Sequence, residues 1–369
     1  MKFKCLKNDI VELVNHANNF TTSKNLNTIL QNLYIEAEGN EITIKSTNLQ
    51  TAFTGKFEAD IEQTGTTTIP AKKFAEILKE LPDGSIINAE FTGSKFIIKC
   101  GKSKFTLSTL PPEHFPTIAD ITPEYFIRLK SEQLKVMFEK IQFCISNDRS
   151  KPEYTGGHFK VFGNKLELSA ADFQKIGVTE SNFEEEFSDE FTINIPKKTI
   201  TELIKILDIN EYISIETDRK QAIFKTGNIT IYTKLIEKYI SSLNKLFNIE
   251  YKVSVKLPKS KILESVKRVS TLTSDITHAA VFSFNQNQLD IYSLETEYGH
   301  GYESVDGIEY EYEPMDIILN TKHVIDILSH IDSEFFIMKL VGRKNPILFY
   351  PDDDWYKYLL TPISIERKH

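Results

Sequence analysis

The sequence predicts an α+β fold built from three repeated modules, each with two helices and several antiparallel strands. The first observation is a stretch that occurs three times. It reads TIPAKKFAEILKELPDG from Thr68, NIPKKTITELIKILDIN from Asn194 and ILNTKHVIDILSHIDSE from Ile318. Each copy joins a short β-type run to apolar residues at helical spacing. The copies recur about every 125 residues, which is near the size of one domain and too long for a solenoid repeat.

A second repeated stretch has the same period. It reads KFKCLKNDIVELVNHA from Lys2, FIRLKSEQLKVMFEKIQ from Phe126 and YKVSVKLPKSKILESVKRVS from Tyr251. Each copy is an alternating strand, a polar turn and an amphipathic helix. We therefore expect three homologous modules, covering residues 1–120, 121–248 and 249–369.

The composition is that of a globular protein. The 369 residues are 40% hydrophobic and 26% charged, with a net charge of −8, and no run approaches the roughly 20 apolar residues of a membrane span. The N-terminus MKFKCLKND has no apolar signal region, so we expect a cytoplasmic protein without membrane association. Cys5, Cys100 and Cys144 form no close pair, which disfavours disulfides and zinc and predicts buried thiols.

The elements are expected in the same order in each module. Asn8 is the expected N-cap of the first helix, and Pro82-Asp83-Gly84 ends the second. Helices are predicted at residues 8–20, 72–81, 131–146, 197–207, 259–273 and 321–331. Strands are predicted at residues 2–5, 29–37, 41–47, 51–58, 85–92, 95–100, 104–109, 125–129, 158–162, 165–170, 175–182, 190–195, 212–217, 221–226, 229–235, 251–257, 279–285, 288–294, 302–310, 315–319, 334–340, 346–350 and 355–362.

Nothing in the sequence supports catalysis. It contains no Gly-rich phosphate loop, no His-Glu-x-x-His, no Cys-x-x-Cys and no Gly-x-Ser-x-Gly. His323 and His330 share one predicted helix but lack a third ligand, so surface positions are favoured over a metal site. The run Asp352 to Asp354 is interpreted as a solvated turn rather than a cation site. We therefore expect no enzymatic activity, no cofactor and no metal.

The placement of charge is more informative than the total. The six predicted helices carry more lysine and arginine than aspartate and glutamate, although the whole chain is acidic. One interpretation is ordinary solvated helix faces, where Lys beside Glu is common. The other is that the polar faces of all six helices point at one polyanion, through contacts to a phosphate backbone that do not depend on sequence.

A family resemblance is carried by the run Ile-Pro-Ala-Lys-Lys from Ile69 and by GKSKFTLSTLPPEHFP from Gly101. With the MKF start and the three modules, these resemble the bacterial DNA polymerase III beta subunit, the β sliding clamp, from Met1 to Ile365. The resemblance implies a non-enzymatic processivity factor. It would be a ring-shaped, head-to-tail homodimer with helices inside and sheets outside, threaded by duplex DNA without sequence specificity.

Ring closure requires two identical contacts between the first module of one copy and the third module of the other. Phe105 and Leu107 alternate on a predicted edge strand, whose backbone would otherwise be unpaired. The alternative is that both are core residues of the first module. Gly299, His300 and Tyr302 occupy acidic positions of the family, which weakens the electrostatic part of closure. The interface that the resemblance implies comprises Lys73, Lys95, Lys102, Lys104, Phe105, Leu107, Thr271, Leu272, Glu295, Glu297 and Glu303.

The resemblance also implies a hydrophobic pocket between the second and third modules. It would take an extended peptide from the DNA polymerase III catalytic subunit, the clamp loader and other proteins with a clamp-binding motif. Phe173 stands where the family has Gly, and Ser241 replaces a usual Pro, so a changed motif preference is expected. The implied wall comprises Tyr154, Ala171, Phe173, Gln174, Lys175, Ile176, Ser241, Leu243, Lys245, Leu246, Asn320, His323, Lys344, Pro346, Leu359, Thr361, Pro362, Ile363, Ser364 and Ile365.

Double-stranded DNA is the third implied partner. A closed ring holds DNA by topology rather than by affinity, so the acidic total charge does not disfavour it. The DNA contacts that the resemblance implies are Lys24, Lys72, Lys79, Arg149, Lys151, Lys197 and Lys198.

Two other classes of function stay open at this point. An interaction protein that keeps the fold without holding DNA is favoured by the altered pocket and the thin acidic interface. An enzyme with an unrecognised site is disfavoured by the missing motifs. A dimer in solution separates the first two classes from the enzyme, and loading onto closed DNA separates the clamp from the interaction protein.

Overall fold

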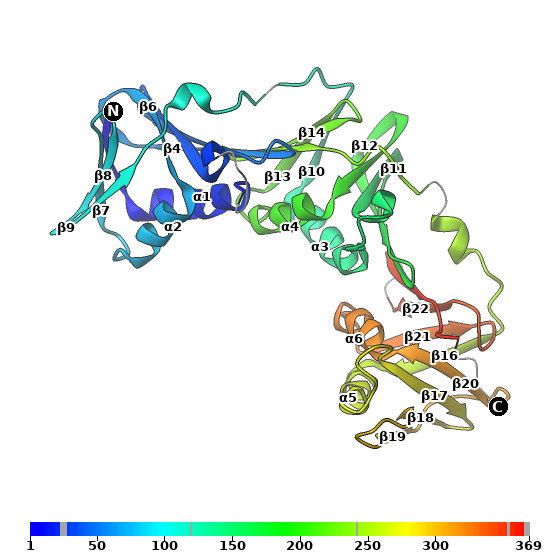
Figure 1. The fold of residues 1–369 in the computed structure, drawn as a ribbon. Coiled ribbons are helices and arrows are strands. Elements are labelled where there is room, and N and C mark those ends of the chain that lie inside the picture. The colour runs from blue at the N-terminus through cyan, green and yellow to red at the C-terminus, as the bar shows by residue number, and fades with distance from the viewer. Residues whose placement is uncertain (23–27, 119, 241–242, 353–354, 365–369) are drawn as a thin grey trace. The chain divides into compact units, whose positions relative to one another are not determined.

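The computed structural model forms two compact units (Figure 1). The first unit is Met1–Lys135 with Lys198–Leu235, and the second is Val136–Lys197 with Ile236–His369. The central third of the chain is therefore shared between them. The structure describes residues 1–22, 28–118, 120–240, 243–352 and 355–364, and it describes the backbone but not the side chains of 184–189 and 244–245.

The strands in these ranges form four sheets, and every pairing between named strands is antiparallel. The strand bounds are β1 (Lys2–Leu6), β2 (Asn32–Glu38), β3 (Glu41–Thr47), β4 (Thr51–Glu58), β5 (Asp60–Gln63), β6 (Gly65–Pro70), β7 (Ile86–Phe91), β8 (Lys95–Cys100), β9 (Ser103–Ser108), β10 (Tyr125–Lys130), β11 (Gly156–Ala171), β12 (Lys175–Pro196), β13 (Tyr212–Thr217), β14 (Gln221–Thr226), β15 (Ile229–Lys234), β16 (Val253–Pro258), β17 (Ala279–Asn285), β18 (Gln288–Ser293), β19 (Tyr302–Asp306), β20 (Met315–Asn320), β21 (Phe335–Leu340), β22 (Ile347–Pro351) and β23 (Tyr356–Leu360).

Each α-helix begins at the residue directly after a strand, as the two repeated stretches predict. The apolar residues at helical spacing are the buried ones, for example Phe74 and Leu78 in the second helix, which is why these amphipathic segments pack against sheets. The helix bounds are α1 (Lys7–Asn19), α2 (Ala71–Glu80), α3 (Ser131–Ile141), α4 (Lys197–Ile206), α5 (Lys259–Ser270) and α6 (Thr321–Ser329).

Two sheets cross the boundaries between the repeated segments. The eight-stranded sheet of the first unit has the order β10-β13-β14-β15-β4-β3-β2-β6, and Ile231 of β15 lies opposite Phe53 of β4. The six-stranded sheet of the second unit has the order β11-β12-β23-β22-β21-β16, and Leu359 of β23 lies opposite Ile176 of β12. We call the β15–β4 pairing the first junction and the β23–β12 pairing the second junction.

The strand order itself repeats. The five-stranded sheet is β5-β1-β7-β8-β9 and the four-stranded sheet is β19-β18-β17-β20. The run β1-β7-β8-β9 matches β10-β13-β14-β15 and β16-β21-β22-β23, and the run β19-β18-β17-β20 matches β4-β3-β2-β6. In the described part of the chain, β9 and β19 end their sheets, although they hold the positions that β15 and β4 use to pair.

Several local predictions were wrong. Asn8 is not the N-cap, because α1 already begins at Lys7; the Asn8 side chain instead accepts a hydrogen bond from the Gly84 N–H at 3.0 Å. The predicted strand 29–37 begins with a 3₁₀ turn, Thr28–Gln31. The four strands predicted between residues 158 and 195 are two long ones, β11 and β12. The short strand β5 was not predicted, and β19 ends at Asp306 rather than at residue 310.

The three cysteines are buried free thiols, which confirms the prediction. Burial raises the pKa of the Cys5 thiol to about 12 and that of Cys144 well above its usual range, so both stay protonated at neutral pH. Among the described residues, no helix has the length and apolar content needed to cross a membrane.

Candidate functional site

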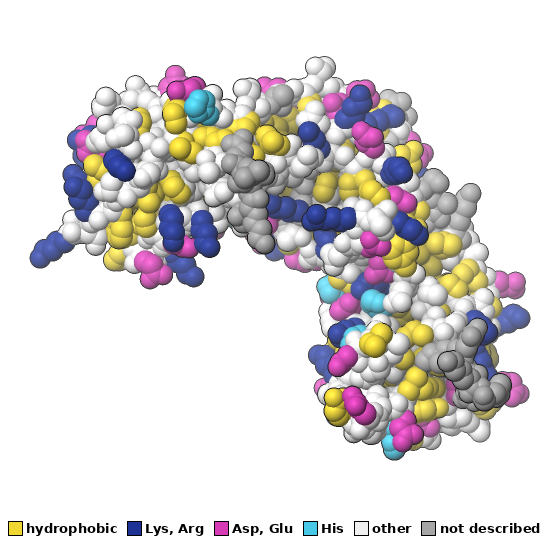
Figure 2. All heavy atoms as spheres, viewed as in Figure 1, with side chains coloured by type: hydrophobic (Ala, Val, Ile, Leu, Met, Phe, Trp, Pro, Cys, Tyr) yellow, Lys and Arg dark blue, Asp and Glu magenta, His cyan; other side chains and the backbone are white. Residues whose placement is uncertain are grey.

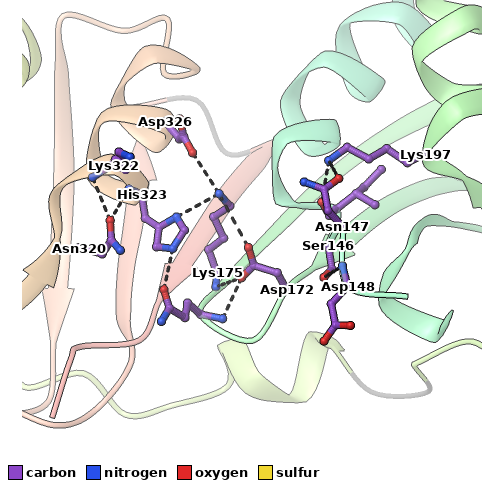
Figure 3. Close-up of polar contacts among 12 residues, drawn as sticks. Ser146, Asn147, Asp148, Asp172, Lys175, Lys197, Asn320, Lys322, His323 and Asp326 are labelled. Carbon is purple, nitrogen blue, oxygen red and sulfur yellow. Dashed lines mark hydrogen bonds and ion pairs between the residues drawn. The ribbon is translucent and has the colours of Figure 1, made fainter. Parts of the chain in front are cut away.

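A buried lysine at the start of β12 organises one polar cluster (Figure 3). Lys175 is 5% exposed, and its Nζ lies 3.0 Å from Asp326 Oδ2 and 3.8 Å from Asp172 Oδ2. The same Nζ lies 3.1 Å from His323 Nδ1. Two carboxylates therefore compensate a charge that is largely removed from water, which is the condition for keeping a buried ammonium.

The cluster also fixes the tautomer of a histidine. The Lys175 ammonium has only donors, so His323 Nδ1 accepts and the proton sits on Nε2, which donates to Gln174 Oε1 at 2.6 Å. Burial, and then the Lys175 charge, lower the pKa of His323, which favours the neutral ring at neutral pH. His323 thus bridges α6 and the turn between β11 and β12.

Local hydrogen bonds hold both ends of this bridge. Asp172 Oδ1 accepts from the N–H groups of Gln174 and Lys175 at 2.8 and 2.7 Å, which closes the β11–β12 turn. Asn320 caps α6 by accepting from the N–H groups of Lys322 and His323. Two features readable in the sequence, an Asx turn and an Asn cap, therefore orient the side chains.

An apolar cluster lies on the sheet of the second junction. Phe247, Leu348 and Leu359 are buried in it with Val178, and Ile176 packs against them. The C-terminal segment is tied in by two backbone hydrogen bonds, from Thr361 N–H to Gln174 O and from Ile363 N–H to Ile318 O, both 2.8 Å. The structure thus brings together a large part of the predicted pocket wall.

Beside the turn lies an exposed aromatic side chain. Phe173 is 48% exposed, and its ring centroid lies 5.1 Å from that of Tyr154. Lys151 Nζ lies 4.4 Å from the Phe173 centroid, in cation–π range. Phe173, which stands where the family has Gly, therefore presents an open apolar surface with a cation beside it.

The two end strands carry the other candidate surface. On β9, Phe105 and Leu107 are half-buried and Lys104 is exposed. On β19, Glu303 accepts from Arg268 Nε and Nη2 at 2.8 Å each, and this hydrogen-bonded guanidinium lowers the pKa of the carboxyl. Figure 2 shows Lys and Arg side chains gathered at the end of the first unit that carries β7, β8 and β9.

Three family models cover nearly the whole chain. The DNA polymerase III beta subunit models match with their N-terminal domain at residues 1–119, their central domain at 128–240 and their C-terminal domain at 244–364. The chain belongs to the DNA polymerase III beta subunit family. The resemblance in the sequence is thereby confirmed, and the function is that of a DNA polymerase processivity clamp rather than an enzyme.

Relatives and solved structures agree over almost the full length. The Beta sliding clamp of Chlamydia muridarum is 25% identical over 348 residues, 94% of each chain, and that of Staphylococcus epidermidis is 26% identical over 346 residues, 91% of this chain and 92% of the relative. Sliding clamp structures from Pseudomonas aeruginosa and Bartonella birtlesii, both bound to griselimycin, have TM-scores of 0.94 at 21% and 23% identity, covering 99% of this chain and 100% of theirs. These structures confirm the three-domain clamp fold.

The remaining residues predicted for the clamp's pocket lie in different settings. Ala171 pairs with Ile176 across the β11–β12 hairpin, Leu243 is buried, Leu246 is 48% exposed, and Lys344 is exposed between β21 and β22. Pro346 is partly buried, Pro362 is buried and Ser364 is exposed. Ser241, Ile365 and the side chain of Lys245 lie outside what the structure describes.

The predicted DNA residues of the clamp are mostly exposed. Lys72, Lys79, Arg149, Lys151 and Lys198 all present side chains to solvent. Lys197 is different, because its Nζ donates to Ile145 O and Asn147 Oδ1, both at 2.9 Å, and burial lowers its pKa. Lys24 lies outside the described residues.

Several contacts at the clamp's predicted surfaces were missed. Asp326 was not singled out, although it follows His323 by one helical turn and so shares its face. The pairing of Arg268 with Glu303 joins residues 35 positions apart and has no local signal. The expectation of surface histidines was wrong, since His323 and His330 are half-buried and the His330 ring stacks on Phe143 at 4.1 Å.

Proposed function

We propose that two copies of this clamp join head to tail into a closed ring around duplex DNA. The observation that carries the proposal is the repeated strand order. At the first junction β15 pairs with β4, and at the second β23 pairs with β12, whereas β9 and β19 occupy the corresponding places as sheet ends. Pairing β9 of one copy with β19 of another continues the same pattern twice and leaves neither edge open.

The repeat also supplies a register for that pairing. The strands before α1 and α3 are equivalent, and following residue partners from them across each sheet to β9 and β15 aligns Lys104 with Thr230. In the same way, following partners from the strands before α2 and α6 to β4 and β19 aligns Tyr302 with Thr54. Thr230 and Thr54 are partners at the first junction. We therefore expect Lys104 opposite Tyr302, which turns Phe105 and Leu107 toward the covered face.

The proposed modules are those expected from the sequence, at residues 1–120, 121–248 and 249–369. Exposed lysines on α2 and α4 and the basic residues near Lys151 support sequence-independent contacts to phosphate. In the cytoplasm, such a ring would tie the polymerase III catalytic subunit to its template, and the clamp loader would place it there.

The surface around Lys175, Ile176 and Leu359 is the proposed site for a partner peptide. The partly buried Ile176, which packs against the apolar cluster, offers an apolar surface for aliphatic anchors, and the polar cluster beside it offers hydrogen-bond partners for the peptide backbone. Phe173 adds an aromatic surface next to Lys151, which supports a preference for a peptide with an apolar and an acidic residue side by side.

The peptide site has a direct test. Leu359→Ala with Ile363→Ala removes the apolar floor and one wall, so we expect at least a hundredfold loss of affinity for a C-terminal peptide of the polymerase. Leu340→Ala, which removes an equally buried side chain of β21, serves as the control for general loss of stability. Unchanged affinity in the double variant, measured by fluorescence anisotropy, would remove the pocket assignment.

The ring is tested by retention on DNA. The protein is loaded onto a nicked circular plasmid with clamp loader and ATP, and half the sample is then linearised. Loss from linear DNA with retention on circles is the expected result, because a closed ring slides off free ends. Equal retention on both would indicate surface binding. Failure to load on either, with an active loader, would favour the interaction protein that keeps this fold without DNA.

A further inference from the structure

A cavity lies between the first linker and the sheet of the first junction. Its volume is about 480 Å³. Three aromatic rings line it, those of Tyr34, Phe115 and Tyr232, together with the charged side chains Lys45, Glu113 and Asp120. The Tyr34 and Phe115 ring centroids are 5.4 Å apart. The cavity therefore combines aromatic faces with carboxylates.

The sheet residues of this cavity share one face. Tyr34, Lys45 and Thr54 are consecutive cross-strand partners on β2, β3 and β4. Their chain neighbours Ile35 and Phe53 are buried on the opposite face, which α1 covers through its contacts to β3 and β4. The cavity thus opens on the face away from α1, with the linker as its other wall.

The second junction has the same site in a filled form. Asn48 and Asp172 close equivalent turns before β4 and β12, each accepting from the N–H groups two and three residues on. Counting from these turns aligns Thr54 with Val178, and the ladder partners align Tyr232 with Leu359.

In the second junction, Val178 and Leu359 pack with the linker residue Phe247 into an apolar cluster. In the first junction, the linker residue Phe115 is only half-buried, and space remains between it and Tyr232. The equivalent position is therefore filled by apolar side chains at the second junction, whereas at the first junction it is a cavity lined by aromatic and acidic side chains.

The charges around the hollow favour a cation. Lys45 Nζ lies 3.6 Å from Glu36 Oε2, and that pair is close to neutral. Glu113 and Asp120 then leave the cavity with an excess of negative charge. Asp120 also acts on Tyr232, since burial first and this carboxylate second raise the pKa of the phenol. Lys45 already lies 5.2 Å from the Tyr34 centroid, so a cation over these rings has a precedent in the chain itself.

We propose that this cavity binds an arginine side chain from a peptide segment of a partner protein. A planar guanidinium stacks on aromatic faces and donates to carboxylates at the same time, which suits three rings flanked by Glu113 and Asp120. This second docking site is separate from the peptide site at the second junction and has different chemistry.

The test uses the full-length protein with an isotope-labelled Ile118 methyl group, which lines the cavity. The probe is the tripeptide amide acetyl-Gly-Arg-Gly, and its neutral match carries citrulline in place of arginine. We expect the arginine probe to shift the Ile118 resonance saturably and the citrulline probe to bind at least about fivefold more weakly. Asp120→Asn should weaken arginine binding to a similar extent.

Two variants separate this account from a general loss of structure. Lys45→Met removes a like charge from the cavity, so arginine binding should strengthen by about two- to threefold. Glu237→Gln, an exposed carboxylate of the second linker, should change nothing. Equal binding of the citrulline probe, or of tetramethylammonium, would overturn the assignment of a guanidinium site. So would an unshifted Ile118 in a protein that still binds the polymerase peptide.

Discussion

The paired junctions and the open edges of this clamp are formed by equivalent strands of the repeat, but the side chains on these strands are buried to different extents. At the first junction, Ile231 and Thr233 on β15 are 0% and 2% exposed. On β9, the residues in the equivalent places are Phe105 and Leu107, and both remain half-exposed. The sequence of β9 is at least as apolar at these positions, so the difference lies in the missing neighbour strand.

This difference favours the proposed contact between the open edges of two copies. An edge strand with two apolar side chains and unpaired backbone groups is a template for another strand. The second junction supports the same view, since Tyr358 and Leu360 take these places on β23 and are both 0% exposed. A partner strand that buries Phe105 and Leu107 would give the side chains of β9 the same burial as their equivalents on β15 and β23.

The largest effect is expected from substitutions that place charges on the open edge strand β9. In the variant with Phe105→Asp and Leu107→Asp, two carboxylates would enter an apolar contact, so the dimer should dissociate at least about a thousandfold more readily. Sedimentation velocity should show monomers with an unchanged unfolding midpoint. Phe126→Asp is the matched control, because Phe126 is 54% exposed on β10, another end strand. A dimeric double variant would refute the interface.

A paired junction should respond in the opposite way. Ile231→Ala leaves a cavity in a closed sheet, so the free energy of unfolding should fall by about 2–5 kcal/mol while dimer affinity changes little. Phe105→Ala, at the equivalent open position, should weaken the dimer and leave monomer stability nearly unchanged. Denaturant unfolding and sedimentation on both variants measure the contrast, and the same response from both would contradict it.

One buried histidine in the sheet of the second junction should make the free energy of unfolding depend on pH. His158 in β11 is buried, its Nε2 donates to Glu153 O, and burial lowers its pKa to about 4. The unfolded ring binds a proton near its ordinary pKa of 6.5 and the native ring does not. The contribution of His158 to the free energy of unfolding is therefore fully present above pH 6.5, and about 3 kcal/mol of it is lost as the pH falls toward 4. Comparing urea unfolding of the wild type and His158→Asn across that range isolates the effect. A parallel pH dependence in both proteins would exclude His158.

The smallest effect is expected at a charged residue of the open edge. Glu303 is already paired with Arg268 in its own chain, so it gains little from a lysine on the partner. Glu303→Gln should change dimer dissociation by less than about fivefold. A large loss, seen by sedimentation at low and moderate salt, would show that Glu303 exchanges its partner on closure.

How much the sequence could predict follows from the range of each interaction. The repeated helices and the buried cysteines depend on local periodicity and composition, and these predictions hold. The length of β12 was missed, because an acidic run within it breaks the apolar alternation, and the ladder with β11 shifts register there and continues on both sides of it.

Long-range polar contacts were beyond the sequence. Lys175 was predicted as a pocket residue, but its burial depends on Asp326, which lies 151 positions away. The cavity at the first junction was also missed, since only strand register reveals that Thr54 and Tyr232 stand where Val178 and Leu359 fill the second junction.

The most direct test of head-to-tail closure is a pair of cysteines across the proposed contact. Lys104→Cys with Tyr302→Cys puts two thiols opposite each other if β9 pairs with β19 in the register of the first junction, within disulfide reach. The native cysteines are buried and should not react. We predict a covalent dimer under mild oxidation, and none for Lys104→Cys with Glu303→Cys, whose side chains point to opposite faces. No cross-link in the first pair, or equal cross-linking in both, would contradict the account.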